Sequence, residues 1–115
     1  NILELVRMAK KDKEILGVFL FGSYAKNYAR ENSDIDICLI PYKEKPFFKL
    51  KYYFIKANEH IDLHEFWHLP IDIRDSVLRE GVLLYVRKEL DFYDLFLKTS
   101  RTYRDMEHFL NLQKE

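Results

Sequence analysis

Two short polar patterns carry the residue types that could bind a phosphate and a metal ion. Gly22-Ser23 follows the apolar run 18–21, and after ten further residues Asp34-Ile35-Asp36 opens a second apolar run. A glycine lets the chain turn sharply, and a serine where a helix begins places its hydroxyl beside free backbone N–H groups. Asp34 and Asp36 lie two apart on a predicted strand, so both carboxylates leave one face and repel each other unless a divalent cation joins them. A phosphate site beside two carboxylates favours nucleotidyl transfer.

The elements that must position these residues follow from apolar periodicity and turn residues. The predicted fold class is α+β, with a small mixed sheet of about four strands, helices packed on it and a C-terminal helix. We expect strands over residues 18–21, 34–40, 60–66 and 82–86, with Gly17 before the first. We expect helices over residues 1–12, 24–28, 47–58, 70–80 and 91–112, with Gly81 ending the fourth and Asp91 capping the last.

Composition indicates one globular domain with a sizeable core. The chain has 115 residues, 48% of them hydrophobic, with 19 basic and 19 acidic side chains and a formal net charge of zero. Neutral charge argues against a nucleic-acid partner. The single cysteine, Cys38, lies inside a predicted strand and is expected to be a buried thiol. No segment has the length and composition of a membrane span or a signal peptide, so we expect a cytoplasmic protein.

The two polar patterns together resemble a family signature. Gly22-Ser23, ten residues and Asp34-x-Asp36 resemble the Gly-Ser-x10-Asp-x-Asp motif of the DNA polymerase β-type nucleotidyltransferase superfamily, and the short chain resembles its minimal branch, the MNT domains. Residues 61–63 resemble the strand that carries the third carboxylate of this family. Residues 80–85 resemble its closing helix-to-strand step. The resemblance implies a single domain over 1–115, with a core at about 15–86 and a helical extension at about 88–115.

The resemblance also implies roles for individual residues. Two Mg²⁺ ions would be held by three carboxylates, of which the one nearest the attacking hydroxyl would also act as a base. The triphosphate of ATP would be held by the turn after the first strand and reached by a basic side chain. The implied metal ligands and catalytic residues are Asp34, Asp36 and Asp62, and the implied nucleotide-binding residues are Gly22, Ser23 and Lys26.

Four residues leave alternatives open. Asn27 stands where many members of the family have a second glycine, and asparagine is the next best residue for a left-handed turn. Lys26 fits a solvated lysine as well as a triphosphate ligand. Glu65 should point away from Asp62 on a regular strand, but a bulge would make it a rival carboxylate. His64 shares the predicted face of Asp62, where a structural role is favoured over a proton relay.

The function that the resemblance implies is that of an MNT antitoxin, which transfers AMP from ATP to a tyrosine of a partner HEPN ribonuclease toxin. The first alternative is an antitoxin that neutralises its partner by binding alone. The second is transfer to a small-molecule acceptor such as an aminoglycoside. Small size and neutral charge disfavour a polymerase. The apolar stripe of the last predicted helix is long for so small a core, so part of it could meet a partner or a second copy of the chain.

Overall fold

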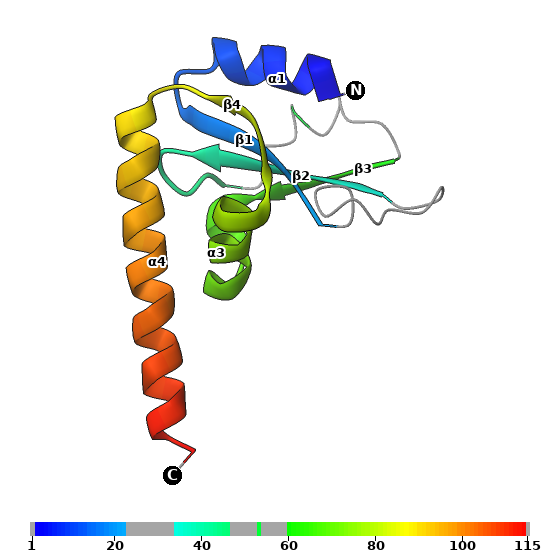
Figure 1. The fold of residues 1–115 in the computed structure, drawn as a ribbon. Helices are drawn as coiled ribbons and strands as arrows, with labels where there is room; N and C mark the ends of the chain where they lie inside the picture. The colour runs from blue at the N-terminus through cyan, green and yellow to red at the C-terminus, as the bar shows by residue number, and fades with distance from the viewer. Residues whose placement is uncertain (1, 23–33, 47–52, 54–59, 115) are drawn as a thin grey trace.

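A four-stranded mixed sheet forms the centre of the molecule (Figure 1). The computed structural model describes residues 2–22, 34–46, 53 and 60–114. The strands are β1 (Ile15–Phe21), β2 (Ile35–Pro41), β3 (Ile61–Glu65) and β4 (Val82–Val86), in the spatial order β3-β2-β1-β4. β1 is antiparallel to both β2 and β4, whereas β3 is parallel to β2. The predicted mixed sheet of four strands is therefore confirmed.

Helices cover both faces of this sheet. They are α1 (Ile2–Lys11), the short 3-10 helix η1 (Phe66–His68), α3 (Ile71–Glu80) and α4 (Glu89–Leu112). α1 lies over one face, and α3 and α4 lie over the other, with α4 extending well beyond the sheet (Figure 1). The predicted helices over 24–28 and 47–58 lie outside the described residues, apart from the helical Tyr53.

Each face of the sheet has its own apolar cluster, because the strands are buried on both sides. Alternate residues of β1 and β2, such as Val18, Ile37 and Leu39, pack with Leu5 of α1. The intervening residues pack with α3 and α4, in a cluster that contains Phe19, Cys38, Ile40, Val77 and Leu95. Cys38 is a buried free thiol, as predicted.

Two residues expected at element boundaries, Gly17 and Asp91, have other roles in the structure. Gly17 lies inside β1 rather than before it, where it pairs with Ile40 of β2 and Val86 of β4. A Cβ at Gly17 would lie 2.9 Å from the carbonyl oxygen of Tyr85, so the close approach of β4 explains the glycine. Asp91 does not cap α4: the helix begins at Glu89 after Lys88, and the Asp91 carboxylate accepts a hydrogen bond of 2.7 Å from the Tyr42 hydroxyl.

Gly81 ends α3, as predicted. Its backbone is extended, with φ −72° and ψ 163°, rather than left-handed. Glycine is needed because a Cβ would lie 2.4 Å from the carbonyl oxygen of Val77 and 3.0 Å from that of Leu20. The last turn of α3 itself and the neighbouring β1 together leave no room for a side chain at this position.

Arg87 fastens the end of β4 to the connection between α1 and β1. Its Nε donates to the carbonyl oxygen of Ile15 at 2.9 Å, and its Nη2 donates to those of Ala9, Lys10 and Asp12 at 2.9, 3.0 and 2.9 Å. The side chain thus satisfies carbonyl groups that the end of α1 leaves without helical partners.

The distal part of α4 exposes apolar side chains. Met106, Phe109, Leu110 and Leu112 are each about half exposed, at 45%, 55%, 52% and 57%. The apolar stripe of α4 that packs on the core therefore continues beyond the part of this helix that lies beside α3 (Figure 1). Within the described ranges, none of the helices combines the length and apolar character that crossing a membrane would require.

Candidate metal centre

Three polar side chains meet on the face of the sheet that α3 and α4 also cover. Asp36 of β2 pairs in register with Asp62 of β3, and Cys38 pairs in the same way with His64. Because β2 and β3 are parallel and in register, Asp36, Asp62 and His64 leave the same face at the edge of the sheet. Ile35 and Ile61 hold this register from the opposite face, where they pack against the α1 cluster.

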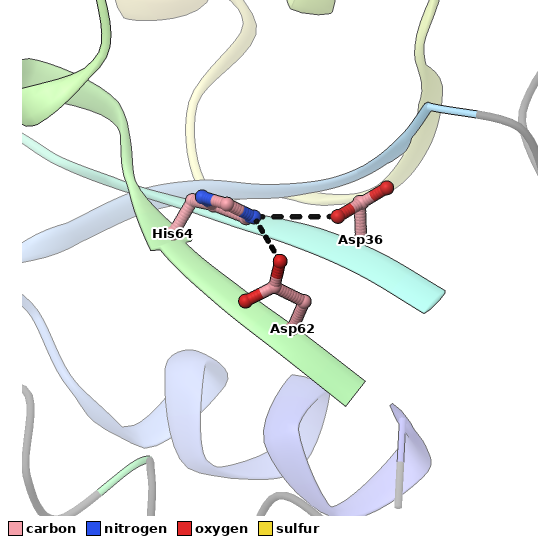
Figure 2. Close-up of side chains that lie close together, drawn as sticks. All are labelled: Asp36, Asp62 and His64. Atoms are coloured by element: carbon pink, nitrogen blue, oxygen red, sulfur yellow. Dashed lines mark hydrogen bonds and ion pairs between the residues drawn. The ribbon is translucent and has the colours of Figure 1, made fainter. Parts of the chain in front are cut away.

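The imidazole of His64 points its Nε2 toward both carboxylates (Figure 2). His64 Nε2 is 3.3 Å from Asp36 Oδ1 and 3.1 Å from Asp62 Oδ2. One potential ligand atom from each of the three residues lies within 4.8 Å of the others. The side chains of Asp36 and His64 are 27% and 28% exposed and that of Asp62 is 55% exposed, so the cluster remains open to solvent on the Asp62 side.

The electrostatics of the cluster favour a cation. Partial burial raises the pKa of Asp36; the hydrogen bond and charge of His64 oppose this rise, and the neighbouring Asp62 carboxylate adds to it. A bound cation would offset both the loss of solvation and the repulsion between the acids. The donor set of two carboxylates and one imidazole therefore fits a divalent metal ion.

Gly22 lies against this cluster at the end of β1. Phe21 pairs with Asp36 across the β1–β2 ladder, so the next residue turns beside the carboxylate. Gly22 has φ +74°, and a Cβ there would lie 2.3 Å from Asp36 Oδ2. Glycine thus serves two needs, a left-handed turn and room for the carboxylate.

The structure brings together only some of the predicted site residues. Asp36 and Asp62 are adjacent, with Gly22 beside them, as the sequence predicts. Asp34 lies just before β2, is exposed, and does not contribute to the three-residue cluster. Its role stays a prediction. Ser23 and Lys26 lie outside the described residues, as does Asn27.

The structure decides the positions of Glu65 and His64, the two residues beside Asp62 for which the sequence left alternatives open. Glu65 is not a rival to Asp62: it is buried, and its Oε1 accepts from the backbone N–H of Trp67 at 2.7 Å as β3 turns into η1. His64, for which the sequence favoured a structural role, contacts both candidate ligands. The available signal was its spacing of two from Asp62, but the sequence did not reveal that its ring also reaches Asp36.

Comparison with known proteins gives the family context of this geometry. The sequence model described as "Polymerase beta, Nucleotidyltransferase" matches residues 4–90. A candidate protein adenylyltransferase of Methanocaldococcus jannaschii is 31% identical over 94 residues, which cover 82% of this chain and 74% of that protein.

Solved structures share the fold. A chain in the crystal structure of a toxin–antitoxin with AMP-PNP superposes with a TM-score of 0.76 at 22% identity, covering 96% of this chain and 90% of that chain. A chain in a structure of the tri-AMPylated Shewanella oneidensis HEPN toxin in complex with MNT antitoxin gives a TM-score of 0.70 at 20% identity, covering 96% and 87%.

Proposed function

The chain belongs to the polymerase beta nucleotidyltransferase family, and from this premise we propose that it is an antitoxin that transfers AMP from ATP to a tyrosine hydroxyl of a partner HEPN-type toxin. The observation that carries the proposal is the in-register pairing of Asp36 and Asp62 beside the left-handed turn at Gly22. A set of acids kept in this arrangement is what nucleotidyl transfer requires, and a protein that only masks its partner has no need of it.

The comparisons support the nature of donor and acceptor. The M. jannaschii relative carries the name of a protein adenylyltransferase. The structural neighbours include a toxin–antitoxin with the ATP analogue AMP-PNP and a HEPN toxin that bears AMP groups in complex with its MNT antitoxin. We therefore propose ATP as the donor and a protein hydroxyl as the acceptor.

The proposed reaction is an in-line displacement at the α-phosphorus of ATP. The tyrosine oxygen forms a bond to the α-phosphorus, the bond from the α-phosphorus to the bridging oxygen breaks, and pyrophosphate leaves. The Asp62 carboxylate, more exposed than its neighbours, takes the proton of the hydroxyl. Gly22 and Ser23 hold the triphosphate, and Lys26 adds positive charge to it. AMP-tyrosine and pyrophosphate are the products.

Metal ions are part of the proposal. Asp36, Asp62 and the exposed Asp34 would hold Mg²⁺, with two ions expected from the family resemblance. When bound, such ions neutralise the charge that develops on the phosphate oxygens. The acids of this chain would position the acceptor oxygen opposite the leaving pyrophosphate, in line across the α-phosphorus.

The test is incubation of the chain with labelled ATP and Mg²⁺, with and without the protein encoded by the neighbouring gene, followed by intact mass of both proteins. We expect AMP units on the neighbour. Asp36→Ala should abolish transfer and preserve the fold and any complex, because one partly exposed acid contributes little packing. Asp105→Asn, an exposed change on α4, is the matched control and should transfer normally.

Three results would overturn the proposal. A stable complex without any mass gain would establish neutralisation by binding alone. Transfer to a small molecule and not to the neighbour would establish a different acceptor. An unfolded Asp36→Ala variant would show that the carboxylate is structural and that the site is wrongly assigned.

A further inference from the structure

We infer that His64 is a third protein ligand of the metal ion held by Asp36 and Asp62, and that its nitrogen makes the site bind Mn²⁺ more tightly than Mg²⁺. This inference rests on the proposed function only in taking the acidic pair as ligands of a divalent cation. It assigns to this chain a mixed carboxylate–imidazole site, and with it a choice of metal.

The distances around His64 suit a shared ion. Ligand atoms at about 2.1 Å from an octahedral ion lie about 3.0 Å apart when they occupy neighbouring corners. His64 Nε2 is already 3.1 Å from Asp62 Oδ2 and 3.3 Å from Asp36 Oδ1 (Figure 2). An ion can therefore enter between these atoms with little movement of the side chains.

The surroundings of His64 hold its ring in place. Its backbone lies in the parallel ladder opposite Cys38. The ring of Phe21 meets the imidazole edge-on, with the ring centroids 5.1 Å apart. Because β3, β2 and β1 each fix one side of the arrangement, Nε2 is aimed at the acids before any ion arrives, and this pre-organisation strengthens binding.

Nitrogen in the donor set decides the preferred metal. Mg²⁺ favours an all-oxygen shell and gives up its water reluctantly. Imidazole is a common ligand of first-row transition metals, and Mn²⁺ is the member of that series that, like Mg²⁺, also suits carboxylate and water oxygens. Mn²⁺ therefore fits a shell of two carboxylates and one imidazole better than Mg²⁺ does. A site with Asp36 and Asp62 alone would suit Mg²⁺, whereas the addition of His64 moves the preference toward Mn²⁺.

A competing role for His64 predicts the opposite sign. A ring that serves only as a positive counterion for the two acids would occupy the place of the metal and compete with it. Removing such a ring would raise the affinity for every divalent cation. Removing a ligand would instead lower the affinity, most strongly for Mn²⁺.

The experiment titrates the full chain with Mn²⁺ alone and with Mg²⁺ alone, by electron paramagnetic resonance and calorimetry, in wild type, His64→Ala, His64→Asn and His108→Ala. We expect wild type to bind Mn²⁺ at least about 10-fold more tightly than Mg²⁺. His64→Ala and His64→Asn should each lower Mn²⁺ affinity at least about 10-fold and change Mg²⁺ affinity less than about 3-fold. His108→Ala, a change at an exposed position of α4, should match wild type.

A spectroscopic measurement tests the inference on the wild-type protein even if the His64 variants do not fold. Electron spin echo modulation of bound Mn²⁺ should show coupling to a histidine ¹⁴N nucleus, retained in His108→Ala and absent in His64→Ala. Absence of this coupling in wild type, or unchanged or increased Mn²⁺ affinity in both His64 variants, would overturn the inference. AMP transfer without nitrogen coupling would refute only the role of His64, whereas nitrogen coupling without transfer would refute only the proposed function.

Discussion

Replacing Gly22 with alanine should separate the stability of the fold from the geometry of the site. An alanine held at φ +74° costs about 1–2 kcal/mol of folding free energy relative to a residue without a Cβ. In a domain of this size the loss corresponds to a decrease in Tm of about 4–8 °C. The new Cβ would also lie 2.3 Å from Asp36 Oδ2, whereas ordinary contact begins at 3.4 Å. The carboxylate must therefore withdraw by about 1 Å, a displacement that can cost about 100-fold in rate.

The assay combines thermal unfolding, metal titration and AMP transfer in a double-mutant cycle of Gly22→Ala and Asp36→Ala. The loss of stability from the left-handed turn should persist in the Asp36→Ala background, because it does not depend on the carboxylate. The matched control is Gly17→Ala, whose Cβ would meet the carbonyl oxygen of Tyr85 at 2.9 Å, away from the cluster. It should lower Tm and leave metal affinity unchanged. Wild-type metal affinity in a folded Gly22→Ala protein would refute the claim that Gly22 makes room for Asp36.

Three further predictions concern buried and charged groups. Arg87→Met removes the charge-assisted hydrogen bonds that the Nε and Nη2 groups share among four backbone carbonyls, and it should cost about 2–4 kcal/mol in the urea-derived free energy of unfolding. A loss no larger than that of the exposed control Arg104→Met would refute the role of Arg87. Burial raises the pKa of Glu65 above its ordinary 4.5, so the folded state holds the carboxyl proton more tightly than the unfolded state does. The stability of the fold should therefore fall as pH rises from 4.5 through the raised pKa. Glu65→Gln should flatten that part of the plot of urea midpoint against pH, and an unaltered plot would contradict this prediction. Asp36→Asn removes a carboxylate whose ionisation the fold disfavours, so the metal-free variant should unfold at or above the wild-type Tm at pH 7, and a clear decrease would show that the ionised form is stabilising.

The core strands could be predicted from the sequence because their apolar runs are buried on both faces. The boundaries of helices and strands were harder to predict, since they depend on contacts between distant residues. Gly17 reads locally as a strand boundary, but the strand continues through it because β4 pairs on that side. From its neighbours in the sequence Asp91 is expected to cap a helix, but its carboxylate accepts a hydrogen bond from the hydroxyl of Tyr42, 49 residues away.

The sequence was enough to predict which acids form the pair and on which face of its strand each side chain lies. Asp36 and Asp62 alternate with apolar residues of their strands, so each acid lies on the face opposite its apolar neighbours, because successive side chains of a strand point to opposite faces. The parallel register that places them opposite each other depends on a crossover of some twenty residues and on packing with α1, which local spacing does not encode. The inward reach of His64 and the burial of Glu65 follow from that register and from the turn into η1.

The fastening of α1 by Arg87 has a consequence for the order in which the chain folds. The guanidinium binds carbonyl groups 72 to 78 residues earlier in the sequence. At about 5–20 residues per second, the ribosome makes Arg87 about 4–15 s after the residues that it secures. During that interval α1 lacks both its terminal hydrogen bonds and the completed sheet. We therefore expect the earliest helix to be among the last elements fixed in place, so that pairing of β4 with β1, rather than formation of α1, commits the domain to its native topology.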